Sequence, residues 1–254
     1  MKAFFIFLGI VFISASSYCQ LELKEYTSIE DANQFPDSVV ELNLSGKQLT
    51  SIPKDVYTYK NLRVLIISKN QIFEIGEEIA NLKELAVLKA ERNKLSQLPT
   101  GIGKLEHLKK LYLKKNQISN LPSSIKNCNQ LENLDLYENG ISVFPESICN
   151  LKNLKDLNLG DNKISSIPAC IKNLTKLRNL RLLGNLINQL PEEICNLENL
   201  MEFDLSENQL TKLPQEIGKL LNLRVFYLYA NSFSENEKKR IIDNLKGCQV
   251  KFNL

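Results

Sequence analysis

The side chains best able to do chemistry are few in this sequence. Its 254 residues include one histidine, His107, and no tryptophan. A catalytic base or a metal site built on imidazole is therefore hard to assemble, and no CxxC pair suggests a zinc site. A nucleophile elbow, a phosphate-binding loop and an HExxH pair are also missing from the sequence. We therefore expect no catalytic residue, no metal and no cofactor, and we predict that the protein is not an enzyme.

Six cysteines could form disulfides in an exported protein. Cys19 ends a signal-like N-terminal segment and would leave with it, so an odd number remains. Cys149 and Cys195 share one position of the repeat described below but lie two units apart, about 10 Å, which is too far for a bridge. We expect free thiols that pack as small apolar side chains. A bridge from Cys170 to Cys149 or to Cys195 is the alternative.

The segment 135–146 partly matches a calcium-binding loop. It begins with Asp135 and has Glu146 at the twelfth place, but its third residue is Tyr137 instead of Asp or Asn. Because other residues of this segment also fit the repeat, we assign no calcium site to it.

The composition is that of an ordinary globular chain. Hydrophobic residues make up 43% and charged residues 24%, which excludes disordered, collagen-like and coiled-coil classes. Lys and Arg total 32 against 29 Asp and Glu, a net charge of +3. This balance gives no reason to expect nucleic acid as a partner.

The N-terminus is typical of a secretory signal peptide. Lys2 precedes an apolar run over 3–13, and small residues follow it. The run is too short to span a membrane, which takes about 20 apolar residues. We predict a signal peptide over 1–19 with cleavage before Gln20, and hence a secreted, periplasmic or cell-surface protein. A lipid anchor on Cys19 is the less favoured reading, because the bulky Tyr18 precedes that cysteine.

A 23-residue repeat dominates the rest of the chain. Segments such as LKKLYLKKNQI (108–118) and LENLDLYENGI (131–141) align without gaps, and the register gives nine units over 39–245. The second half of a unit reads as in LPSSI (121–125). The ninth position is Lys47 in the first unit and asparagine in the other eight, namely Asn70, Asn93, Asn116, Asn139, Asn162, Asn185, Asn208 and Asn231.

These motifs resemble the leucine-rich repeat family, in the 23-residue LPxxI form of bacterial and Ras-suppressor-like proteins. The resemblance implies an α/β solenoid, a right-handed horseshoe with a concave parallel β-sheet. The residues agree, because LxxLxL alternates with the period of a strand and the later proline forbids a long helix. We therefore expect short 3₁₀ or extended structure on the convex side. The asparagines should form a structural ladder, since an amide can satisfy backbone groups that a turn leaves free.

Solenoids need polar caps, because an end unit has only one neighbour. Residues 20–38 are predicted as an N-terminal cap, with a helix that starts near Ser28 and stops at Pro36. Residues 234–254 are predicted as a C-terminal cap, into which the last repeat merges. A capping box at 234–237 starts its helix, and a short strand follows over 248–252.

The concave face carries the predicted binding site. Positions 3, 5, 7 and 8 of each unit face away from the core, and tyrosine and arginine among them suit binding hot spots. The alternative is that exposed strands simply tolerate tyrosine and mixed charge. The predicted partner-binding residues are Lys110, Tyr112, Lys114, Asp135, Tyr137, Asp156, Arg181, Leu183, Asp204, Tyr227 and Tyr229.

The family resemblance and the lack of a catalytic constellation predict an exported module that holds a protein ligand on this face. A structural envelope or surface protein that associates with itself is the alternative. The sequence identifies neither the ligand nor the oligomeric state.

Overall fold

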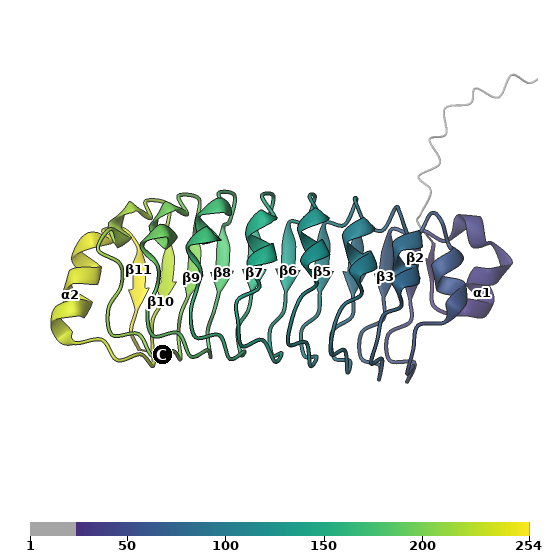
Figure 1. Cartoon of the computed structure of the whole chain (residues 1–254), viewed down its shortest axis with the longest axis horizontal. Coiled ribbons are helices and arrows are strands. Elements are labelled where there is room, and N and C mark those ends of the chain that lie inside the picture. The colour runs from purple at the N-terminus through teal and green to yellow at the C-terminus, as the bar shows by residue number, and fades with distance from the viewer. Residues whose placement is uncertain (1–23, 254) are drawn as a thin grey trace, which may run out of the picture.

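The computed structural model describes residues 24–253, so the predicted signal peptide lies outside the described residues. The described chain forms a solenoid of stacked repeat units with one open sheet of eleven strands, all parallel and in chain order (Figure 1). Neighbouring strands pair at equivalent positions of their units, as Leu111 does with Leu134. The strands are β1 (Glu25–Tyr26), β2 (Glu41–Asn43), β3 (Val64–Ile66), β4 (Val87–Lys89), β5 (Lys110–Tyr112), β6 (Asn133–Asp135), β7 (Asp156–Asn158), β8 (Asn179–Arg181), β9 (Glu202–Asp204), β10 (Val225–Tyr227) and β11 (Gln249–Lys251).

Strand alternation divides each unit between core and surface. Leu134 and Leu136 are 1% and 0% exposed, whereas Asp135 and Tyr137 between and after them are only half-buried. The same pattern in every unit builds one continuous core, which runs the length of the solenoid. The sheet thus has a core side and an outer, concave side.

The convex side consists of short 3₁₀ helices, as the proline pattern predicts. Pro122 precedes such a helix in an extended conformation, and its carbonyl accepts a hydrogen bond from the backbone N–H of Ile125 at 3.0 Å. Proline suits this place because it has no N–H to leave unpaired. The helices are η1 (Pro36–Ser38), η2 (Lys54–Thr58), η3 (Glu77–Asn81), η4 (Thr100–Lys104), η5 (Ser123–Asn127), η6 (Glu146–Asn150), η7 (Ala169–Asn173), η8 (Glu192–Asn196) and η9 (Ile217–Lys219).

The asparagine column links each unit to the one before it. Asn139 accepts a hydrogen bond from the backbone N–H of Ile118 at 3.0 Å. Its amide donates to the carbonyls of Leu113 and Leu136, both at 3.1 Å. The other seven asparagines bond in the same way, whereas Lys47 in the first unit is exposed. Each amide therefore pairs backbone groups of two successive turns.

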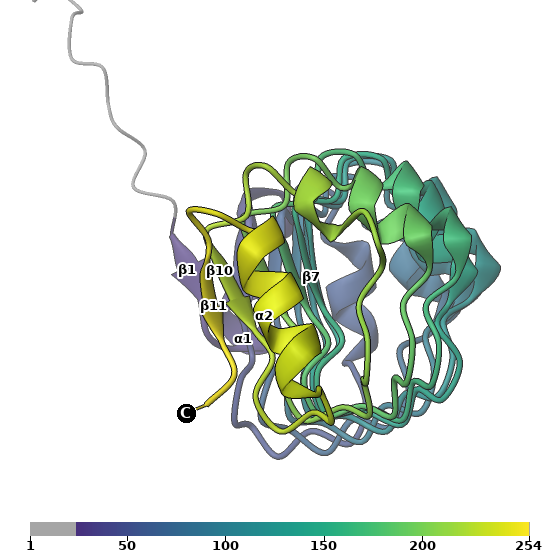
Figure 2. The same ribbon diagram turned by 90° about the vertical axis from the view of Figure 1, so that its left-hand side faces the viewer.

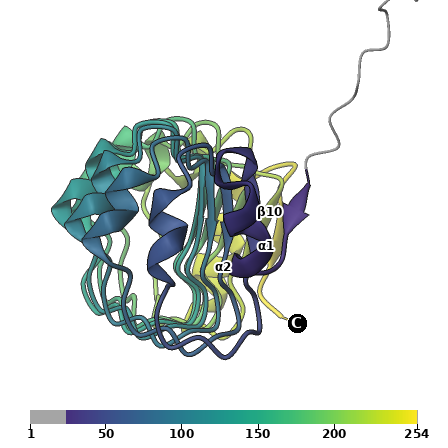
Figure 3. The same cartoon turned by 90° about the vertical axis from the view of Figure 1, so that its right-hand side faces the viewer.

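Both ends of the solenoid are capped by helices. In α1 (Ile29–Gln34), Ser28 accepts the N–H of Asp31 at 3.1 Å. In α2 (Glu235–Asn244), Ser234 accepts the N–H of Glu237 at 3.3 Å. Figure 2 shows α2 across the C-terminal end of the core, and Figure 3 shows α1 at the opposite end. The caps thus cover apolar residues that would otherwise have no neighbouring unit.

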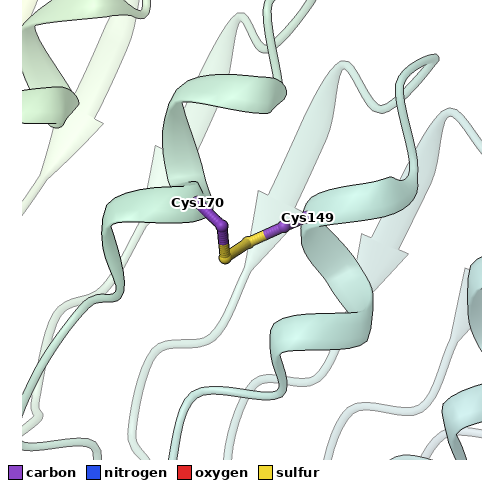
Figure 4. The surroundings of a disulfide bond; sticks show 2 residues. All are labelled: Cys149 and Cys170. Atoms are coloured by element: carbon purple, nitrogen blue, oxygen red, sulfur yellow. A yellow bond between two sulfur atoms is a disulfide. The ribbon is translucent and has the colours of Figure 1, made fainter.

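Our expectation that the cysteines are free thiols is wrong for two of them. Cys149 in η6 and Cys170 in η7 form a disulfide with a Cα–Cα distance of 5.7 Å (Figure 4). The sequence offered this bridge only as the alternative, and positions 19 and 17 of adjacent 3₁₀ turns are the ones that meet. Cys195 lacks this option, because Glu216 stands where its partner would be. Cys195 is free, as are Cys128 and Cys248.

None of the helices within residues 24–253 has the length and apolar character needed to cross a membrane.

Candidate functional site on the concave sheet

The sheet face, by which we mean the side chains at positions 3, 5, 7 and 8 of each unit, carries all eleven predicted binding residues. Of these, Lys110 is exposed, and the other ten are half-buried. They rise from β5 through β10 and from the residues that directly follow these strands. Because neighbouring strands pair in register, equal positions form rows across the face, and side chains of adjacent units meet along each row.

Tyr137 is the most tightly held aromatic residue of the sheet face. Its hydroxyl donates a hydrogen bond to Asp161 of the next unit. The ammonium of Lys114, from the preceding unit, lies 4.5 Å from the centre of its ring. The hydrogen bond to Asp161, together with burial, raises the pKa of the Tyr137 phenol to about 12. This tyrosine therefore stays neutral and fixed in orientation at physiological pH.

Asp135 and Tyr112 lie beside this cluster as register partners on β6 and β5. Burial raises the pKa of Asp135, although a hydrogen bond from the backbone N–H of Tyr137 at 3.0 Å and the charge of Lys114 oppose the rise. Burial also raises the pKa of Tyr112, and nearby carboxylates add to the effect. Among the described residues, none accepts a hydrogen bond from the Tyr112 hydroxyl, so it is free to bind a ligand.

Polar side chains further along the sheet hold one another in place. Asp156 accepts hydrogen bonds from the amides of both neighbours in its row, Asn133 at 2.7 Å and Asn179. The guanidinium of Arg181 forms an ion pair with Glu202 at 3.0 Å. These contacts orient the carboxylates and the guanidinium before any partner arrives.

The absence of a side chain at Gly160 shapes the row of position 7. A Cβ atom on this glycine would lie 3.0 Å from the ring of Tyr137 and 2.6 Å from the Leu183 side chain, so both side chains approach over it. Ser206, two units later in the row, is fully buried, and its hydroxyl has no hydrogen-bond partner among the described residues.

At the end of the sheet, the Lys251 ammonium lies 5.2 Å from the centre of the Tyr227 ring.

Two structural roles on this face were missed by the sequence analysis. Asp135 and Asp204, treated as free of constraint, accept the N–H two residues later and so shape the strand ends. Position 8 has a positive φ in all nine units, although seven of them carry a residue other than glycine there. The alternation of apolar residues carries no information about either feature. Only the Asp and Asn residues that recur at position 5 could have suggested that these side chains accept a backbone N–H.

A groove on the convex side competes with the sheet face as a site. It lies between η8 and η9 and is lined by Cys195, Glu216, Lys219 and Leu221, among others. Glu216 and Lys219 form an exposed ion pair at 3.0 Å. Burial raises the pKa of the Cys195 thiol to about 11, so the groove contains no thiolate at neutral pH. This groove therefore offers no thiolate nucleophile, and its Glu216 and Lys219 neutralise each other. Within residues 24–253, no three His, Cys, Asp or Glu side chains gather as metal ligands.

Comparisons with known proteins give the same architecture. A family described as leucine-rich repeat region matches residues 100–185, and one described as leucine rich repeat matches residues 199–220. No curated protein sequence matches the chain significantly.

Two solved structures resemble the chain. A leucine-rich repeat protein of Leptospira interrogans is 23% identical over 90% of this chain and all of its own, with a TM-score of 0.40. The plant peptide hormone receptor RGFR1, solved in complex with RGF2, is 27% identical over 82% of this chain, with a TM-score of 0.58. The present chain spans 42% of that receptor.

Proposed function

Because this chain is a leucine-rich repeat protein, we propose that it is an exported binding module whose concave sheet face holds a protein partner. The observation that carries the proposal is the cluster around Tyr137. There, two half-buried tyrosines, a lysine and two carboxylates come together from three adjacent units. Aromatic side chains that are already ordered lose little entropy on binding, which is why tyrosine is frequent in binding hot spots. The receptor RGFR1, which resembles this chain, was solved in complex with RGF2.

Export is supported by two independent features. The N-terminal sequence has the layout of a signal peptide. The disulfide between Cys149 and Cys170 fits an oxidising compartment, since such bonds are rare in the cytosol. Mass spectrometry of exported protein tests the processing. We expect a mature chain that starts at Gln20, whereas an intact Met1 or a lipid on Cys19 would contradict this.

The binding face is tested by paired substitutions. Once a partner is captured with the mature chain, Tyr112→Ala with Tyr137→Ala should weaken its binding by about 2 kcal/mol or more, the scale of aromatic hot spots. The matched control, Lys126→Ala with Glu192→Ala, changes two residues of the convex 3₁₀ helices and should leave the affinity nearly unchanged. If the control pair weakens binding and the tyrosine pair does not, the partner uses the other face.

Self-association is the competing proposal, and it makes a different prediction. A structural envelope protein should form oligomers whose size rises with concentration, whereas a binding module should be a monomer that binds its partner saturably. Sedimentation of the mature chain alone distinguishes the two.

A further inference from the structure

The charges of the sheet face are sorted by sign along the solenoid. Units two to four, over 62–130, place six cations and one carboxylate, Glu91, on the face. Units five to eight, over 131–222, place seven carboxylates and one cation, Arg181, on it. The six cations of the first group, which we call the basic half, are Lys69, Lys89, Arg92, Lys110, Lys114 and Lys115. The second group is the acidic half.

Position 8 shows the reversal of sign most clearly. Successive units carry Lys69, Arg92 and Lys115, and the next two carry Glu138 and Asp161. The backbone has a positive φ at each of these residues, so the row has a uniform geometry. The boundary between the halves is bridged by the ion pair of Lys115 with Glu138 at 2.7 Å.

Most of the remaining face charges have no ion-pair partner among the described residues. Apart from the boundary pair, the only ion pair that joins two charges of the face is that of Arg181 with Glu202. Five cations of the basic half and five carboxylates of the acidic half therefore form no ion pair among the described residues. Those carboxylates are Asp135, Asp156, Asp161, Asp204 and Glu207.

Away from their boundary, where Lys115 pairs with Glu138 and Lys114 acts on Asp135, the two halves are too far apart to neutralise each other. Strands spaced by about 4.8 Å place the centre of the basic half about 17 Å from the centre of the acidic half. The Debye length at physiological ionic strength is about 8 Å, so each half presents its own potential. Like charges on neighbouring strands also repel each other, and a ligand of opposite charge would relieve that repulsion.

We propose that the partner of this face is an extended protein segment whose charges are separated into blocks, with carboxylates on the basic half and lysine or arginine on the acidic half. This inference rests on the proposed function of the same face. An extended segment rises about 3.3 Å per residue, so block centres about five residues apart match the 17 Å spacing. A second copy of the chain fits less well, because two concave faces set against each other meet at their ends and not over the charged middle.

Two peptides of equal composition test the proposal. One has four Glu, one Gly and four Lys in that order, and the other alternates Glu and Lys about a central Gly. Both have no net charge, so they differ only in charge separation. Fluorescence anisotropy at low salt should show the block peptide binding at least about tenfold more tightly, and the difference should vanish near 1 M salt because the charges are exposed.

Protein variants locate the effect on the face. Lys110→Glu with Lys114→Glu should abolish the preference for the block peptide. Lys126→Glu with Lys172→Glu changes the net charge equally but on the convex side, and should preserve the preference. Equal binding of both peptides, binding of neither, or equal losses in both variants would overturn the proposal.

Dimers at low salt that dissociate in the Lys110 and Lys114 variant would identify a second copy as the occupant and would also overturn it. Such dimers would also support self-association over the proposed function. The peptide results do not decide that function, which the tyrosine pair tests separately with the captured partner.

Discussion

Single side chains in this protein act mostly by linking neighbouring units. The asparagine column pairs backbone groups of successive turns, and Tyr137 joins three units through Lys114 and Asp161. Such contacts fix side chains of the sheet face while they stabilise the stack. Stability and the ordering of the sheet face therefore depend partly on the same residues.

Replacing Asn139 by alanine should destabilise the fold. The change leaves the backbone N–H of Ile118 without its acceptor, which costs about 1–3 kcal/mol when such a group is buried, whereas the Leu113 carbonyl keeps the amide of Asn116 as a donor. Lys47→Ala, at the same position of the outermost unit, should cost much less because this residue is exposed. Urea unfolding measures both, and equally small losses would refute the column as a source of stability.

The phenol of Tyr137 should titrate late. Its pKa is raised to about 12, chiefly by the hydrogen bond to Asp161, so the folded protein keeps a proton that the unfolded chain loses near pH 10. The stability that this proton contributes is present below pH 10 and is lost as the pH rises towards 12. Asp161→Asn should lower the pKa, as seen by absorbance at 295 nm with Tyr137→Phe to assign the transition. An unchanged titration in Asp161→Asn would contradict the assigned cause.

At the scale of elements, the short 3₁₀ helices carry the covalent link of the solenoid. The disulfide joins η6 to η7 across a sequence separation of 21 residues. It fastens two units in the middle of the stack, where the acidic half of the sheet face begins.

Thiol labelling tests the disulfide directly. Alkylation of the unfolded mature protein should modify three cysteines, Cys128, Cys195 and Cys248, and reduction should expose two more. Cys149→Ser with Cys170→Ser should lower the free energy of unfolding by roughly 3 kcal/mol, as expected for closing a loop of this length. The single variant Cys195→Ser keeps the bond and is the control for polarity at a buried site. Five labels without reduction would show that the bond is absent.

At the scale of the whole molecule, periodicity determines what can be predicted from the sequence. Strand positions, the buried leucines and the 3₁₀ helices after proline follow from residues that recur in register, and both cap helices follow from their N-cap serines. The two-residue strand β1 precedes the repeat, and no pattern indicates it. The disulfide joins different positions of adjacent units, and the sequence offered it only as one of the alternatives. The hydrogen bond from Tyr137 to Asp161 also joins different positions, and no alignment of equal positions reveals it. The place of each charge on the face can be read from the sequence once the strand register is known.

The central claim is that the sheet face binds the partner, and hydroxyl-radical footprinting of the free and partner-bound protein tests it most directly. We predict that Tyr112 and Tyr137 become protected on binding. Phe73, which is 53% exposed and lies outside the sheet face, should react equally in both states. Protection of Phe73 with unchanged reactivity of the two tyrosines would contradict the claim.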